Sequence, residues 1–216
     1  MTPAAHRQPL EHDFRPRVTA AILAGGHARR LGGVDKSALT IGSLSILERQ
    51  VSLLRGLTTH ILVIARNRPP RLPADVTMVP DRIVGAGSLG GLYTALLEAP
   101  TEHVLVIACD MPFLTAPFLA RLAACGADVD VAVPRDAHGR HPLCACYARR
   151  VAGHLKARIE TGDLQVSEAL RDLRVRELGP DELAPFDRDG LLLLNVNTPD
   201  DYAKALTSIA TTPPTA

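Results

Sequence analysis

A stretch near the start of the chain combines glycines and cations in a way that suits phosphate chemistry. An apolar run passes directly into Gly25 and Gly26. The cations Arg30 and Lys36 follow within the same stretch. Glycine has no Cβ, so backbone N–H groups can approach a ligand closely, and successive N–H groups after a strand form a concave anion site. We interpret residues 20–36 as a cradle for a nucleoside triphosphate, the alternative being an ordinary strand-to-helix loop with solvated arginines.

Two better-known glycine-rich phosphate motifs do not fit. A P-loop requires G-x-x-x-x-G-K-[ST], whereas Asp35 precedes Lys36 where that motif needs glycine. The segment 85–91 formally matches the dinucleotide fingerprint G-x-G-x-x-G, with Asp110 about 20 residues further on. That fingerprint must follow its strand directly, but residues 81–84 intervene. We therefore reject the dinucleotide site, although an oxidoreductase using this loop stays open to a test of NADH binding.

The first glycine-rich stretch resembles the signature of nucleotidyltransferases with a Rossmann-like fold. It reads L-A-G-G and then R-L-G-G-x-D-K, a form similar to the molybdenum cofactor guanylyltransferase family. The resemblance covers residues 19–206 and implies a three-layer α/β fold with a mostly parallel twisted sheet and a small antiparallel element. It implies Mg²⁺-dependent transfer of GMP from GTP to molybdopterin, with release of diphosphate. A cytidylyltransferase, another nucleotidyltransferase acting on a pterin or sugar phosphate, and a non-catalytic nucleotide-binding regulator stay open.

The resemblance also assigns roles to individual residues. It places the nucleotide-binding residues at Leu23, Ala24, Gly25, Gly26, Lys36, Asn67, Asp81 and Asp110. It makes Arg30 and Lys36 catalytic through their charge, together with Asp110. The context C-D-M-P around Asp110 is similar to the family's metal-binding C-D-x-P, so this carboxylate is expected to hold Mg²⁺. From the residues alone, Asp110 fits a magnesium ligand or a turn aspartate equally well.

The choice of base is expected to depend on Asp81 and the glycines that follow it. The segment resembles the part of the family that closes over guanine. A carboxylate there would accept hydrogen bonds from guanine N1–H and N2–H₂, which adenine does not supply. The family usually carries G-P-L-A-G-L, whereas residues 87–92 read G-S-L-G-G-L. Because this change is expected to loosen and widen the loop, cytosine stays open as the base.

Three further residues are expected on the acceptor side. H-P-L from His141 resembles a family segment near the acceptor, and N-V-N-T-P from Asn195 resembles the family's N-x-N-T-P. We expect Asn195 and Asn197 on one face of a strand, because they are two residues apart. A turn histidine and a structural Asx turn are the alternatives.

The elements that must position these residues follow from apolar patterning. Strands are predicted at 18–23, 60–65, 76–79, 104–108, 130–134, 142–147, 174–178 and 191–196, and helices at 46–57, 92–98, 116–124, 149–159, 167–173 and 199–209. Alternation of strands and helices predicts an α/β fold with a mostly parallel sheet. The short connection between 130–134 and 142–147 predicts an antiparallel pair. Ligands bind beyond the carboxyl ends of such strands, where Gly25, Asn67, Asp81, Asp110 and Asn197 all fall.

Composition limits the remaining possibilities. The 216 residues predict one domain at 18–209, with a disordered extension at 1–17 and a disordered tail at 210–216. A net charge of +1 and 3% aromatic residues disfavour nucleic acid as a partner. The four cysteines form no C-x-x-C, so we expect buried free thiols and a cytoplasmic protein with no membrane span. The expected partners are GTP and molybdopterin or molybdenum cofactor, with molybdopterin-handling proteins or molybdoenzymes as candidate protein partners.

Overall fold

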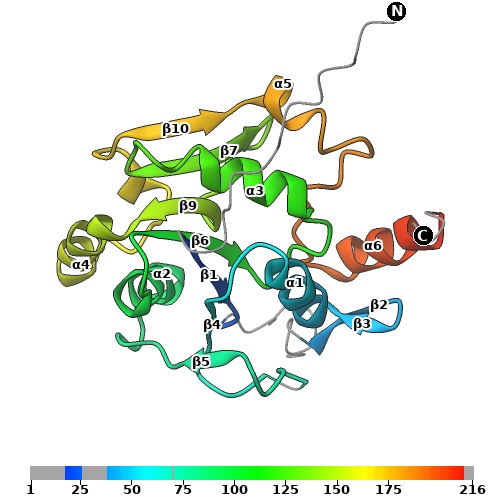
Figure 1. The fold of residues 1–216 in the computed structure, drawn as a ribbon, viewed down its shortest axis with the longest axis horizontal. Helices are drawn as coiled ribbons and strands as arrows, with labels where there is room; N and C mark the ends of the chain where they lie inside the picture. The colour runs from blue at the N-terminus through cyan, green and yellow to red at the C-terminus, as the bar shows by residue number, and fades with distance from the viewer. Residues whose placement is uncertain (1–17, 26–37, 70, 212–216) are drawn as a thin grey trace, which may run out of the picture.

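A mixed sheet forms the middle of the molecule (Figure 1). The structure is a computed structural model and describes residues 18–25, 38–69 and 71–211. Its strands are β1 (Val18–Leu23), β2 (Thr40–Ile41), β3 (Leu44–Ser45), β4 (Ile61–Ile64), β5 (Thr77–Val79), β6 (His103–Ala108), β7 (Val131–Asp136), β8 (Gly139–Arg140), β9 (Cys144–Ala148) and β10 (Val175–Leu178). Its α-helices are α1 (Ile46–Arg55), α2 (Gly87–Glu98), α3 (Ala116–Ala124), α4 (Ala152–Glu160), α5 (Pro180–Leu183) and α6 (Pro199–Thr211), with 3₁₀ turns at Arg149–Val151 and Glu168–Leu170.

The strand order is β10-β7-β9-β6-β1-β4-β5, with β8 paired to β7 and a separate β2–β3 hairpin. The pairs β1–β4, β1–β6, β4–β5 and β7–β10 are parallel. Strand β9 is antiparallel to both β6 and β7, so the antiparallel pair expected from the sequence is confirmed. The carboxyl ends of β1, β4, β5, β6 and β7 consequently meet at one edge of the sheet.

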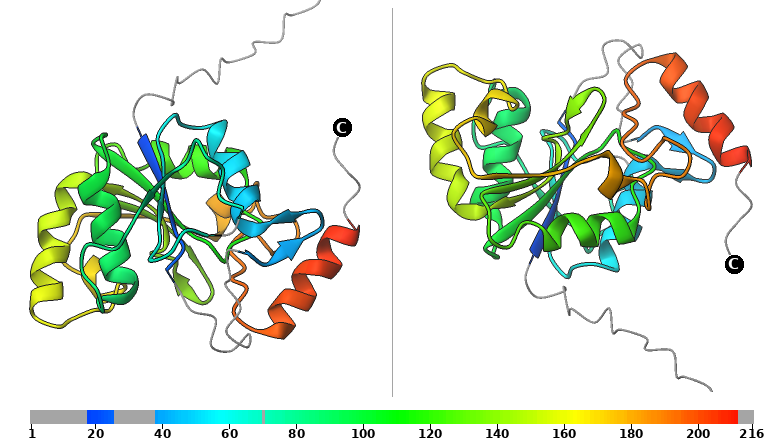
Figure 2. Two further views of the ribbon diagram at one scale, coloured as in Figure 1. Left: turned by 90° about the horizontal axis from the view of Figure 1, so that it is seen from below. Right: turned by 90° about the horizontal axis from the view of Figure 1, so that it is seen from above.

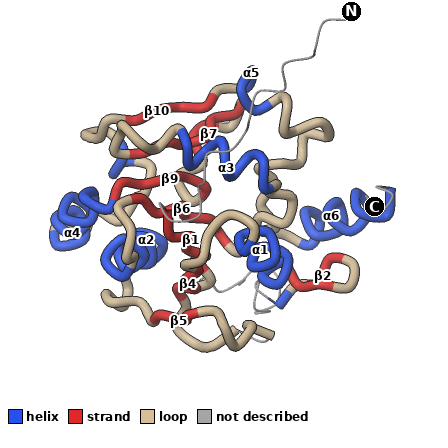
Figure 3. The backbone as a smooth tube through the Cα atoms, viewed as in Figure 1, coloured by secondary structure: helices blue, strands red, loops and turns tan. Residues whose placement is uncertain are grey.

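Helices cover both faces of this sheet (Figures 2 and 3). On one face, Leu47 of α1 and Leu119 of α3 pack with Ile22 of β1. On the other face, Leu92 of α2 and Leu155 of α4 belong to a second core. The central strands are buried on both sides, as continuous apolar runs in a parallel sheet require. This arrangement confirms the expected three-layer α/β fold.

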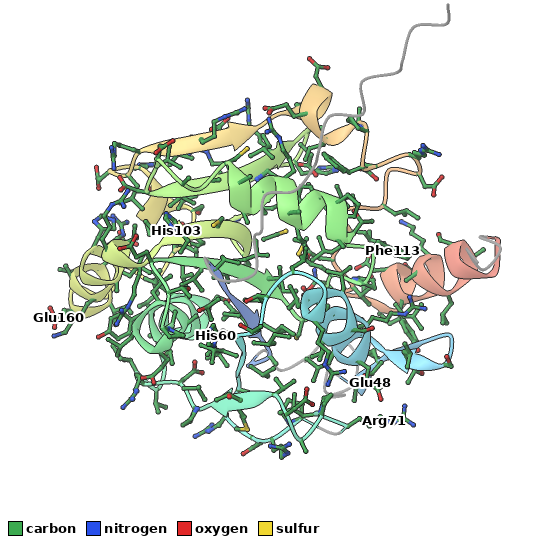
Figure 4. The ribbon with its side chains drawn as sticks, in the orientation of Figure 1. Glu48, His60, Arg71, His103, Phe113 and Glu160 are labelled. Atoms are coloured by element: carbon green, nitrogen blue, oxygen red, sulfur yellow. The ribbon has the colours of Figure 1, made fainter. Side chains whose placement is uncertain are left out.

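Local capping fixes where the helices that flank the sheet edge begin. At α1, the Ser45 hydroxyl accepts from the Glu48 N–H at 3.1 Å, and the Glu48 carboxylate accepts from the Ser45 N–H at 2.7 Å (Figure 4). At α6, the Thr198 hydroxyl accepts from the Asp201 N–H at 3.1 Å, and Asp201 accepts from the Thr198 N–H at 2.9 Å. Such reciprocal bonds satisfy donors that a helix start leaves unpaired. The predicted N-cap at Thr198 is confirmed.

A small third core joins α6 to the start of α1 and to the β2–β3 hairpin. It contains Ile41, Ile46, Val196 and Ala205, all buried. The ring of Phe113 packs against it between the end of β6 and α6 (Figure 4). This core holds the segment before α6 close to the carboxyl end of β6.

The strand predicted at 191–196 is wrong, because this segment is an irregular loop. Its backbone donors bond to side chains and turns in place of a strand ladder. The Leu192 N–H donates to the Asp187 carboxylate at 2.9 Å, and the Val196 N–H donates to the Asp110 carbonyl at 2.8 Å. An apolar run of this length fits a buried loop as well as a buried strand, and tertiary partners decided between them.

The glycine-rich segment predicted as a loop is also partly wrong, because α2 begins at Gly87 and not at residue 92. Gly85 and Gly87 have φ of +90° and +57°, the left-handed region that only glycine enters without strain. Those two residues form the turn into α2. The remaining glycines, Gly90 and Gly91, lie inside α2. Nothing in the local sequence distinguishes these two helical glycines from the two glycines that form the turn.

The cysteines behave as apolar core residues, as expected. Cys109, Cys144 and Cys146 are buried and Cys125 is half-buried, all as free thiols. Burial raises the pKa of Cys144, and it raises the pKa of Cys146 to about 12. Among the described residues no helix is long and apolar enough to span a membrane.

One carboxylate holds the outer strands together and gives a pH-dependent test of the fold. Asp130 accepts from the Arg174 guanidinium, from the Arg174 N–H at 2.9 Å and from Arg150 at 2.9 Å. These bonds lower the pKa of Asp130 to about 2. A lowered carboxyl pKa adds stability above the unfolded-state value of about 3.9, and that stability is lost as pH falls through the folded-state value.

We expect Asp130→Asn to lower the free energy of unfolding at pH 7 by about 1–2 kcal/mol, after discounting for the exposed arginines. The difference from wild type should be constant above about pH 4.5 and shrink as pH is lowered toward about 2. Urea unfolding at a series of pH values measures it, with Asp128→Asn, an exposed neighbour, as control. A difference that does not change with pH would contradict this assignment.

Candidate active site

The end of β1 is held on both sides by its neighbours. The Ala24 N–H donates to the Ile64 carbonyl of β4 at 2.8 Å, and the Cys109 N–H donates to the Leu23 carbonyl at 3.1 Å. Gly25 follows and is exposed at the carboxyl edge of the sheet. The remaining residues of the expected phosphate cradle, Gly26, Arg30 and Lys36, lie outside the described residues.

Asp81 is brought against this loop from an edge strand 56 residues away in sequence. A Cβ added at Gly25 would lie 3.5 Å from its Oδ2, and a Cβ added at Gly91 of α2 would lie 3.5 Å from its Oδ1. The carboxylate is therefore flanked by two backbone segments that carry no side chains. Its Oδ1 is buried and has no hydrogen-bond partner in the described part of the chain. Burial raises the pKa of Asp81. A carboxylate oxygen in this position can accept hydrogen bonds from a ligand.

The glycines of α2 are explained by close packing. A Cβ added at Gly90 would lie 2.8 Å from the Cβ of Ala86 and 3.1 Å from the Ile83 carbonyl. Ala86 therefore occupies the space that the alanine of G-P-L-A-G-L would need. The change to Gly90 compensates for Ala86 within a helix, and the expectation that it widens a loop is wrong.

Asp110 is half-buried in the turn that follows β6. Its carbonyl accepts from the Val196 N–H at 2.8 Å, so the segment containing Asn195 and Asn197 lies beside the turn. The described residues contain no group of three or more His, Cys, Asp or Glu side chains that could hold a metal. Mg²⁺ is commonly bound by one or two carboxylates, with phosphate oxygens and water completing its six ligands. A single carboxylate held in a bonded turn beside the expected phosphate cradle fits that chemistry.

The asparagines do not share a strand face, because the segment before α6 is irregular. Asn195 is half-buried and Asn197 is exposed. The Asn197 N–H donates to the Asp201 carboxylate at 3.1 Å, so its backbone belongs to the start of α6. The structure nonetheless brings both residues to the neighbourhood of Asp110 through Val196.

Two other expected site residues lie in loops after β4 and before β9. Asn67 is exposed in the bend that follows β4. His141 lies between β8 and β9, with its Nε2 2.8 Å from Asp136 Oδ2 and its N–H donating to the Pro134 carbonyl at 3.0 Å. Strand β9 separates β7 from β6, so His141 is at the same sheet edge as Asp110 but on the far side of β9.

The sequence interpretation did not single out Gln50, which the structure places behind the Asp110 turn. Its side-chain amide donates to the Ala108 carbonyl at 2.8 Å and to the Met111 carbonyl at 3.1 Å. The signal that could have found it is a polar residue on the apolar face of α1, beside Leu47 and Leu54. Gln50 is only 3% exposed there.

Comparison with known proteins agrees with this geometry. A model of the MobA-like NTP transferase domain matches residues 20–177. The chain is 33% identical over 192 residues to the probable molybdenum cofactor guanylyltransferase of Pelotomaculum thermopropionicum, covering 88% of this chain and 92% of that protein. It is 29% identical over 193 residues to the molybdenum cofactor guanylyltransferase of Desulfosudis oleivorans, covering 89% and 96%.

The structure is also similar to a solved one. It superposes on the molybdopterin-guanine dinucleotide biosynthesis protein A of Archaeoglobus fulgidus with a TM-score of 0.78 and 25% identity, covering 90% of this chain and 100% of that chain.

Proposed function

Because the chain belongs to the MobA-like NTP transferase family, we propose that it transfers GMP from GTP to molybdopterin or molybdenum cofactor. The products are the guanine dinucleotide form of the cofactor and diphosphate. The names of the relatives support GTP as donor and molybdopterin as acceptor. The observation that carries the proposal is the meeting of Gly25 and Asp81 at the sheet edge on which Asp110 also lies.

On the nucleotide side, the backbone N–H groups of Gly25 and Gly26 would hold the phosphates, and Leu23 and Ala24, which are bonded into the sheet, would line the nucleotide site. Asp81 would accept the N1–H and N2–H₂ donors of guanine. Its unpaired Oδ1 and its position between two glycines support this role. Asn67 would reach the nucleotide from the bend after β4.

On the reaction side, the terminal phosphate of molybdopterin attacks the α-phosphorus of GTP, a new P–O bond forms, and diphosphate leaves. The attacking phosphate is ionised near pH 7, so no general base is needed. Two polyanions must approach each other, and positioning with charge neutralisation is therefore the main task. Arg30 and Lys36 would neutralise charge on the α-phosphate and the leaving group. Asp110 would hold Mg²⁺, which supplies further neutralisation at the phosphate oxygens.

The acceptor side is proposed to use Asn195, Asn197 and His141. The position of Val196 against the Asp110 turn supports the two asparagines. His141 would contact the acceptor at a greater distance from the transferred phosphate, because β9 lies between.

Diphosphate release tests the proposed function. We expect release from GTP with Mg²⁺ only when molybdopterin is present, and much less release from CTP, ATP or UTP. Release with CTP in preference to GTP would assign the chain to the cytidylyl branch. Binding of GTP without release under any condition would make the chain a non-catalytic nucleotide-binding protein.

Asp81→Asn is expected to raise the dissociation constant for GTP about tenfold or more, because one charged acceptor is lost and an amide donor faces a donor of the base. Isothermal titration measures this, with Asp189→Asn, an exposed residue, as control. Since desolvation raises the pKa of Asp81, its charge costs stability at pH 7. The ligand-free variant should therefore melt at or above the wild-type temperature. Unchanged discrimination between GTP and ATP would remove Asp81 from base recognition.

A further inference from the structure

The turn that carries Asp110 is fixed from three directions by groups outside it. From β1, the Leu23 carbonyl accepts from the Cys109 N–H at 3.1 Å. From the segment before α6, the Val196 N–H donates to the Asp110 carbonyl at 2.8 Å. From α1, one side-chain amide, that of Gln50, holds the carbonyls on either side of the turn. The first two contacts are made by backbone atoms, whereas the third is made by the side chain of Gln50.

The two bonds of Gln50 span the turn. Its Nε2 donates to the Ala108 carbonyl at 2.8 Å and to the Met111 carbonyl at 3.1 Å. Ala108 is the last residue of β6, and Met111 is the residue after Asp110. Both hydrogens of the amide are used, and they fix the distance across the residue that carries the carboxylate.

The oxygen of the Gln50 side-chain amide indicates the role of this residue. Gln50 Oε1 is buried and has no hydrogen-bond partner among the described residues. A buried unpaired oxygen costs free energy that an apolar side chain of similar size would not. The neighbouring buried positions of α1 are Leu47, Val51 and Leu54. A glutamine that carries this cost on an apolar face is expected where its two donors are needed.

We infer that Gln50 is a positioning residue that holds the Asp110 carboxylate in the geometry required by the metal-bound triphosphate. The inference rests on the proposed function only for what Asp110 binds. Groups that orient a metal ligand typically contribute 10- to 100-fold to metal affinity or activity. A displaced carboxylate would weaken neutralisation in the reacting complex more than it weakens binding of the base, which Asp81 contacts on the other side of β1.

The test uses Gln50→Met, which keeps the length of the side chain and removes both donors. Its matched control is Arg49→Met, the adjacent residue of the same helix. Arg49 donates to the Ile41 carbonyl at 3.2 Å and 3.0 Å, which directs its guanidinium to the β2–β3 hairpin and not to the Asp110 turn. Gln50→Leu serves as a second variant if Gln50→Met does not fold, and every assay is run well below the melting temperature of each variant.

Two readouts are expected to separate Gln50→Met from the control. In the protein without ligands, amide hydrogen exchange should accelerate at Val196, whose N–H donates to the Asp110 carbonyl, and at Cys109, whose N–H donates from the turn to the Leu23 carbonyl of β1. With Mn²⁺ and GTP, the apparent dissociation constant for Mn²⁺ should rise about tenfold and kcat should fall about tenfold, with KM for GTP changed less than about twofold. Arg49→Met should show neither change.

The outcomes distinguish this inference from the proposed function. Suppose that the wild type binds Mn²⁺ with GTP, that Gln50→Met binds them equally well, and that amide exchange at Val196 is unchanged. The role inferred for Gln50 is then overturned, and the proposed function stands. If KM for GTP rises as much as kcat falls, Gln50 acts on the whole site and the positioning role is overturned. If the wild type binds no nucleoside triphosphate with Mn²⁺, the proposed function fails, and faster exchange in the variant would then assign Gln50 a purely structural role.

Discussion

Replacement of Asp110 by Asn is expected to lower Mg²⁺-dependent release of diphosphate by about 10³-fold, a loss of several kcal/mol of charge stabilisation. The substitution keeps the shape of the side chain and removes its charge. The turn is fixed by the backbone of β1, by Val196 and by Gln50, so the chain should fold normally. The asparagine would then stand in the correct place without the anionic oxygen that a hard divalent cation prefers.

The measurement is a Mg²⁺ titration of diphosphate release, with the melting temperature of each protein recorded in parallel. Asp189→Asn again provides a charge-matched control on the surface. A partial return of activity at high Mg²⁺ would agree with weakened metal binding. Wild-type dependence on Mg²⁺ in Asp110→Asn would show that the metal is bound elsewhere.

Replacement of Lys36 by Ala is expected to lower turnover about 10²- to 10³-fold, the scale for loss of one preorganised electrostatic group. The argument comes from the sequence, in which Lys36 ends the glycine-rich stretch after β1. Its positive charge would stabilise the transition state more than the bound substrate, because negative charge builds on the leaving diphosphate as the bond breaks. We therefore expect kcat to fall more than KM for GTP rises, which marks an interaction made mainly in the transition state.

The control for this variant is Lys156→Ala on α4, whose side chain is exposed and pairs only loosely with Glu160, at 3.6 Å. Lys36→Arg should restore part of the activity, because it keeps the charge but not the shape of an ammonium. Turnover near that of wild type in Lys36→Ala would remove this residue from the mechanism.

Much of the scaffold followed from local sequence. The predicted bounds of β1 and α3 agree with the structure, and the N-cap at Thr198 is confirmed. These elements are specified by residues close together in the chain: a continuous apolar run, an amphipathic spacing, and a hydroxyl that caps the first turn of a helix. The positions of Gly25, Asp81 and Asp110 just beyond predicted strand ends likewise predicted that they lie at one edge of the sheet.

Other features depended on contacts between distant parts of the chain. The apolar run at 191–196 is a loop because Asp187 and Asp110 take its backbone donors. Gly90 and Gly91 lie inside α2, whose buried residues Leu89 and Leu92 pack with Val104 and Val106 of β6. Apolar composition and glycine content are the same for either outcome, so the sequence could not separate them.

The sequence by itself determined which residues have the chemistry expected for binding phosphate, metal and base, because side-chain chemistry and backbone freedom are local properties, and their roles stay predictions. Only the tertiary structure decided how they are supported. It placed the half-buried Asp81 between two glycines and the amide of Gln50 across the Asp110 turn. Asp81 and Gly25 are 56 positions apart in sequence, and Gln50 is 58 and 61 positions from the two residues whose carbonyls it bonds. The distances between them in the fold are set by the packing of α1 against the sheet and by the pairing of β5 with β4, which no short stretch of sequence encodes.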